Sequence, residues 1–152
     1  MPLGDFNRLP EGKALEELMR CCGSTAWAKA VAAARPYADR AELLATAAVA
    51  WSELGQDARL EAFHHHPRIG EKQLREKFGS TAQWAGQEQS GVKLAAEDVL
   101  TALAEGNREY ERRFGRIFLV CATGKTAPEM LAILRGRLAN EPAAEFAVAC
   151  AE

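Results

Sequence analysis

All three histidines of this chain stand side by side, as His64, His65 and His66, directly before Pro67. Histidine has an unperturbed pKa of ~6.5, so it can act as a general acid or base, and it is a common metal ligand. Ligands on one helix share a face only when they are three or four residues apart, whereas consecutive residues point about 100° apart. The triplet therefore fits a metal site poorly, although a histidine-dependent metal protein stays an alternative.

The proline divides the triplet into two parts. Because a residue before proline disfavours the helical conformation, a helix that begins at Gln56 is expected to end near His65. His64 and His65 are then expected to face solvent in the last helical turn, where the helix dipole mildly favours a cation. His66 instead stands at a corner that the fixed φ of Pro67 makes rigid, which suits a general acid or base.

Three other stretches contain polar groups in unusual settings. WAGQEQSG places Glu88 and Gln89 between two glycines, which indicates either a surface helix or a close approach of another group to its backbone. FGRIFLVCATGK, residues 114–125, is apolar and non-helical, so its backbone groups either lie in a buried connector or bind a polar ligand. In LRGRLAN, Arg137 and Asn140 share a helix face that is either solvated or functional.

The remainder of the chain predicts helices that position these stretches. Alanine, leucine, glutamate and arginine, all of which favour helix, dominate the sequence. Ser24, Asp39 and Thr126 are good N-caps before apolar helical patterns. We therefore predict an all-α fold, a single-domain helical bundle over residues 1–152 with short non-helical loops forming the site. The expected helices cover residues 11–21, 25–34, 40–54, 56–65, 81–91, 95–114, 126–140 and 141–152.

Composition and charge exclude several classes of protein. The chain has 152 residues, of which 48% are hydrophobic and 26% charged, and its net charge is −2 with acids and bases interleaved. No basic face is evident, so nucleic acid is not an expected partner. No apolar run reaches the ~18 residues that a membrane span needs. The start of the chain lacks the layout of a signal peptide, and the four cysteines show no CxxC spacing. We therefore expect reduced thiols and a cytoplasmic location.

Four motifs in register resemble the 2-oxo-4-hydroxy-4-carboxy-5-ureidoimidazoline (OHCU) decarboxylases of uric acid degradation. They are HPRIGE at residues 66–71, WAGQEQ at 84–89, FGRIFLVCATG at 114–124 and RLAN at 137–140. The similarity extends over nearly the whole chain. No single motif is decisive, but four in this order rarely coincide by chance.

The resemblance implies a helical carboxy-lyase that needs no cofactor and converts OHCU, a small-molecule substrate, to S-allantoin and carbon dioxide. It makes His66 the catalytic residue, with Glu88 holding the ureido group and, if close, keeping His66 protonated. Backbone groups of the 117–121 strip would bind the ring edge. The resemblance also allows a homodimer. Residues expected to bind substrate are Pro67, Gln89, Ile117, Phe118, Leu119, Val120, Cys121 and Arg137.

Two departures from the family pattern affect the expected site. Ala85 stands where the family often has a serine, which removes one hydrogen bond to substrate. The family usually continues into a basic RLRL segment that supplies a pocket arginine, whereas this sequence stops at Glu152. We therefore expect a shortened C-terminal tail, with Arg137 or another cation in that role. The rival hypothesis is a non-catalytic helical adaptor that binds a peptide in an exposed apolar groove.

Overall fold

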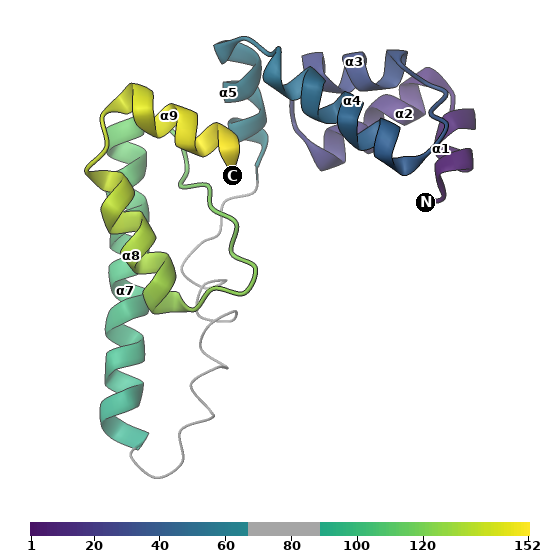
Figure 1. Ribbon diagram of the computed structural model, residues 1–152. Helices are drawn as coiled ribbons and strands as arrows, with labels where there is room; N and C mark the ends of the chain where they lie inside the picture. The colour runs from purple at the N-terminus through teal and green to yellow at the C-terminus, as the bar shows by residue number, and fades with distance from the viewer. Residues whose placement is uncertain (67–88) are drawn as a thin grey trace. The chain divides into compact units, whose positions relative to one another are not determined.

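A computed structural model describes residues 1–66 and 89–152, with side chains described for residues 1–66 and 97–152. In these ranges the regular structure is helical and contains no strand, which confirms the all-α class (Figure 1). The chain divides into two compact units, Met1–Pro67 and Arg68–Glu152. The prediction of one domain over residues 1–152 is not decided by this division.

The first unit is built around one central helix, α3, which contacts three others: α2, α4 and α5. Its core is aromatic and aliphatic. Trp27 is buried and donates its indole N–H to the carbonyl of Ala47 over 2.9 Å, and Val31 is fully buried beside it. A buried indole with a satisfied N–H is a strong packing anchor. The helices are α1 (Leu3–Arg8), α2 (Glu11–Cys21), α3 (Thr25–Ala33), α4 (Arg40–Ser52) and α5 (Gln56–His65).

The three predicted N-caps are confirmed. The Ser24 and Asp39 side chains each accept a backbone N–H from the first turn of the helix that follows. Thr126 forms a full capping box with Glu129, in which each side chain accepts the other residue's backbone N–H. Such caps satisfy amide groups that have no partner within the helix, so they set where each helix begins.

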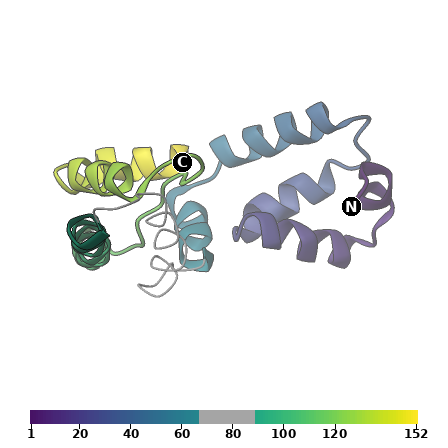
Figure 2. The same cartoon turned by 90° about the horizontal axis from the view of Figure 1, so that it is seen from below.

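The second unit pairs two helices that run in the same direction. They are α7 (Gln89–Phe114) and α8 (Ala127–Leu138), and α9 (Pro142–Ala151) follows them. The parallel direction follows from two contacts. Gly106 faces Leu134, and Tyr110, one turn later in α7, faces Arg137, almost one turn later in α8. Figure 2 looks along the axis of α7, with α8 beside it.

The parallel pair explains why a non-helical strip exists. The connection from the end of α7 must travel back along the pair before α8 can begin, as Figure 1 shows for the segment before α8. An extended chain covers about 3.3 Å per residue and a helix only about 1.5 Å, so a short extended segment returns the length of a helix. Residues 117–122 accordingly have no regular secondary structure, as the sequence predicted.

Close contact between α7 and α8 also accounts for a glycine within a helix. A Cβ atom added to Gly106 would lie 2.6 Å from Cδ2 of Leu134, which is fully buried. The glycine therefore allows the two helices to approach, which offsets its poor helix propensity.

Two helices depart most from the sequence prediction, whereas the ends of the others differ by two residues at most. Helix α1 was not expected, because its segment is too short for a periodic apolar pattern; it is held by the burial of Phe6. Helix α7 begins at Gln89, whereas we predicted residue 95. The helix expected over residues 81–91 lies, up to residue 88, outside the described residues.

Candidate functional site

His66 stands where the sequence predicted, as the C-cap of α5. Its backbone is extended, with φ −66° and ψ 130°, while its N–H still donates to the carbonyls of Ala62 and Phe63. The helix therefore ends at His65, as expected from the proline that follows. The His66 side chain is exposed.

Two side chains near the end of α5, Glu61 and His65, attach it to Thr25, the first residue of α3, and to Gly23, two residues earlier. The Glu61 carboxylate accepts the Thr25 hydroxyl over 2.6 Å and the Thr25 backbone N–H over 3.0 Å. These two bonds, the hydroxyl first, lower the pKa of Glu61. His65 Nδ1 lies 2.7 Å from the Gly23 carbonyl oxygen, and because that oxygen can only accept, Nδ1 carries the proton.

This attachment corrects part of the sequence prediction. His64 and His65 do end the helix and are exposed. His65 is nevertheless not merely solvated, because it connects α5 to a residue 42 positions earlier. Local spacing could not reveal this contact. The two attachments hold the helix end from which His66 projects.

We expect Gly23→Ala to disturb this attachment. A Cβ atom at Gly23 would lie 2.2 Å from the His65 Cβ, so the end of α5 must shift. Overpacking of this kind costs about 1–3 kcal/mol. Urea unfolding should show that loss, and the NMR signals of His65 and His66 should move. Gly12→Ala is the control, because nothing lies within 4 Å of its Cβ position; equal stability of the two variants would contradict this contact.

The strip at residues 117–121 is partly buried by its apolar side chains. Phe118 packs edge-on against Tyr110 with ring centroids 5.3 Å apart, and both Phe118 and Val120 pack on the core of the second unit. The Arg137 guanidinium lies 4.8 Å from the centre of the Phe118 ring. Ile117, Phe118, Leu119 and Val120 are half-buried, whereas Cys121 is exposed. The strip is thus a packed connector whose backbone has no sheet to join within the described residues.

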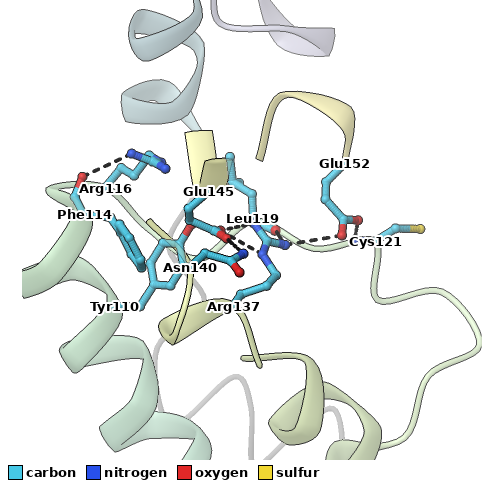
Figure 3. A network of polar contacts seen from close by, with 9 residues as sticks. All are labelled: Tyr110, Phe114, Arg116, Leu119, Cys121, Arg137, Asn140, Glu145 and Glu152. Atoms are coloured by element: carbon cyan, nitrogen blue, oxygen red, sulfur yellow. Dashed lines mark hydrogen bonds and ion pairs between the residues drawn. The ribbon is translucent and has the colours of Figure 1, made fainter. Parts of the chain in front are cut away.

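Arg137 is the centre of a polar network beside this strip (Figure 3). Its Nη2 and Nε lie 2.6 and 2.8 Å from Glu145 Oε1. Its Nη1 donates to the Leu119 carbonyl over 2.6 Å and lies 3.3 Å from Glu152 Oε1. The other carboxylate oxygen of Glu152 accepts the Cys121 N–H over 2.8 Å. Two backbone groups of the strip are therefore held by side chains of α8 and of the residue that follows α9.

Glu145 is the acid at the centre of this network. Its side chain is 0% exposed, and it accepts from the Tyr110 hydroxyl, from Arg137 and from Asn140 Nδ2. Burial alone would raise its pKa, but these hydrogen bonds outweigh burial and lower the pKa of Glu145. Burial, together with the neighbouring carboxylate, raises the pKa of Tyr110 to about 12. Glu145 is therefore a carboxylate and Tyr110 a neutral donor at neutral pH.

The contacts in this network show which groups the Arg137 side chain binds. The shared face of Arg137 and Asn140 is confirmed, since both contact Glu145. The solvated alternative is wrong, because Arg137 is only 6% exposed. Its described contacts are with protein acceptors, so the role of pocket cation is not supported by them. The sequence did not predict roles for Glu145, Tyr110 and Glu152, although an acid within the apolar pattern of α9 was a visible signal for Glu145.

Cys121 has a thiol that ionises more readily than usual. Its pKa is lowered first by the backbone N–H of Thr123 and then by the Thr123 hydroxyl, with a smaller effect from Lys125. Lys125 Nζ donates to the Cys121 carbonyl over 2.6 Å. Lys125 thus binds the strip itself.

The other predicted site residues lie beyond what the structure describes. Pro67 and Glu88 fall outside the described residues, and so does the expected contact between Glu88 and His66. Gln89 is the first residue of α7, but its side chain is not described. Among the residues that are described, no three His, Cys, Asp or Glu side chains gather in a way that could hold a metal ion. None of the described helices is both long and apolar enough to cross a membrane.

Comparison with known proteins relates these features to a family. The model of the OHCU decarboxylase family matches residues 7–152. The uric acid degradation bifunctional protein TTL of Arabidopsis thaliana is 32% identical over 138 residues, which cover 90% of this chain. The chain spans only 43% of that plant protein's length.

Two further relatives match over larger shares of their own length. The 2-oxo-4-hydroxy-4-carboxy-5-ureidoimidazoline decarboxylase of Amia calva is 30% identical over 119 residues, which cover 78% of this chain and 67% of the fish protein. A crystal structure of an OHCU decarboxylase in the presence of (S)-allantoin superposes with a TM-score of 0.69 at 34% identity, covering 90% of this chain and 88% of that one. The family match, these identities and the shared helical fold together show that the chain belongs to the OHCU decarboxylase family.

Proposed function

We propose that this protein decarboxylates OHCU to (S)-allantoin and carbon dioxide during uric acid degradation, as a carboxy-lyase without a cofactor. The family match over residues 7–152 carries this proposal. A solved relative at 34% identity was crystallised in the presence of (S)-allantoin, which would be the product here. We further propose that the protein works in the cytoplasm and that two copies form a homodimer.

The substrate itself supplies the electron sink for this reaction. Its carboxylate is attached beside a ring C=N bond. When the carbon–carbon bond to the carboxylate breaks, carbon dioxide leaves and the electron pair passes into that C=N bond. A proton then adds to the ring carbon from one face, which sets the chirality of allantoin. The protein must therefore orient the carboxylate and deliver one proton. Orientation can lower the barrier by several kcal/mol. A placed proton donor raises the rate about 10²–10⁴-fold.

We assign the proton transfer to His66. The observation that supports this is its exposed side chain at a helix end that Glu61 and His65 attach to the neighbouring turn. A preorganised histidine side chain can first act at the substrate hydroxyl and then protonate the ring carbon. Glu88 would hold the ureido group and, if it approaches His66, favour the protonated imidazole.

Substrate binding is assigned to residues before α7, at its start and after its end. Pro67 and Gln89 would contact the substrate. Backbone groups of the strip Ile117–Cys121 would bind the ring edge. We propose that Arg137 acts through this strip, since its guanidinium already binds Glu145, the Leu119 carbonyl and Glu152.

A coupled assay tests the proposed function directly. OHCU is unstable, so it is generated in place by urate oxidase and hydroxyisourate hydrolase acting on urate. Adding this protein should make allantoin appear faster than in the spontaneous reaction, as the (S)-enantiomer alone, measured by circular dichroism. Heat-denatured protein is the control. Racemic allantoin at the spontaneous rate would overturn the proposal.

A further inference from the structure

The C-terminal end of the chain reaches back to the strip that we assign to substrate binding. Glu152 Oε2 accepts the Cys121 N–H over 2.8 Å, and Arg137 Nη1 donates to the Leu119 carbonyl over 2.6 Å. Glu152 Oε1 and Arg137 Nη1 are 3.3 Å apart, so the two side chains also contact each other. Figure 3 shows these contacts forming one continuous chain of polar groups from Leu119 through Arg137 and Glu152 to Cys121.

We infer that Glu152 and Arg137 are positioning residues for substrate binding, because together they set the orientation of both peptide groups that flank Val120. The inference rests on the proposed function, in which the strip contacts the substrate. Neither side chain needs to touch the substrate for this role. Each acts through a backbone atom of the strip.

The geometry of the peptide bond gives the physical reason. In a trans peptide the C=O and the N–H point in opposite directions. With the Leu119 carbonyl directed at Arg137, the Val120 N–H must point away from Arg137. With the Cys121 N–H directed at Glu152, the Val120 carbonyl must point away from Glu152. The network therefore turns a donor and an acceptor on the same residue toward the opposite side of the strip.

A donor next to an acceptor is complementary to the amide-like edge of a ureidoimidazoline ring, which offers N–H and C=O groups in turn. The strip cannot obtain this orientation from a sheet, since the described residues contain no strand. Charge-assisted hydrogen bonds to Arg137 and Glu152 replace the missing ladder. Such bonds are shorter and stronger than neutral ones, so they hold the peptide groups tightly.

The two positioning residues differ in what else they support. Arg137 is buried and paired with Glu145, so its loss affects folding as well as the strip. The Glu152 side chain is 25% exposed and lies after the last turn of α9, so its loss should spare the core. Glu152 is therefore the residue with which to test positioning separately from stability.

The test compares Glu152→Ala with Glu152→Gln and with Glu141→Ala. Glu141 is an exposed glutamate at the other end of α9, where its side chain makes no capping bond. Two readouts are measured on the full chain: hydrogen exchange of the Cys121 amide by NMR, which needs no activity, and KM and kcat for OHCU.

Glu152→Ala should raise the exchange rate of the Cys121 amide about tenfold and raise KM about tenfold, as expected for the loss of a hydrogen bond to a charged group. It should change kcat much less, because the proton donor is untouched. Glu152→Gln should restore part of both effects, since an amide oxygen can still accept the Cys121 N–H. Glu141→Ala should match the unaltered protein in both readouts.

Two results would overturn the inference. One is an active unaltered protein whose KM does not change in Glu152→Ala. The other is unchanged exchange of the Cys121 amide in that variant, which would mean that Glu152 does not hold the strip. An inactive unaltered protein would instead contradict the proposed function, so failure of the function and failure of positioning give different results.

Discussion

His66→Asn should lower the rate of (S)-allantoin formation by about 10²–10⁴-fold, close to the spontaneous rate. Asparagine retains a hydrogen-bonding side chain but cannot exchange a proton near neutral pH. The backbone N–H of His66 caps α5 whatever the side chain, so the fold should survive. The measurement is the initial rate in the coupled assay, followed by circular dichroism.

The adjacent histidine provides a matched control for this variant. His64 is also exposed and also lies at the end of α5, two residues before the corner at His66. His64→Asn should therefore retain normal turnover and chirality. Thermal unfolding of both variants checks that the fold is intact. Turnover near that of the unaltered protein in His66→Asn would refute its assignment as the proton-transferring residue.

The second large effect concerns stability. Arg137→Met or Glu145→Leu should each lower the free energy of unfolding by about 3–5 kcal/mol, because each leaves the other charge buried without its partner. Glu145 is 0% exposed in its side chain and Arg137 8%, so water cannot compensate within the folded state. Urea unfolding monitored by circular dichroism measures the loss.

A double variant measures the interaction between Arg137 and Glu145 separately from the other contacts that each side chain makes. Arg137→Met combined with Glu145→Leu should be more stable than the sum of the two single losses predicts, because no uncompensated charge stays buried. Arg135→Met is the matched control, since Arg135 is exposed on the same helix and should change stability by less than about 0.5 kcal/mol. Strictly additive losses in the double variant would show that the two side chains do not act as a pair.

Much of the helical structure is determined by the sequence itself, because its causes are local. Ser24, Asp39 and Thr126 begin their helices by accepting amide groups three residues ahead, and such caps are visible in sequence. The end of α5 at His65 follows from steric exclusion by Pro67, which stands two residues later. Motif order likewise identified the family, as the match over residues 7–152 confirmed.

Only the tertiary structure decided what several of these residues do. Arg137 looked like a surface or pocket cation, yet its partners are Glu145, eight residues on, and the carbonyl of Leu119, eighteen residues back. His65 meets Gly23 across 42 residues. Helical period describes which residues share a face of one helix, but not which other element covers that face. The sequence alone therefore distinguished His66 from His64 and His65. The network that holds the strip appeared only once α7, α8 and α9 were packed together.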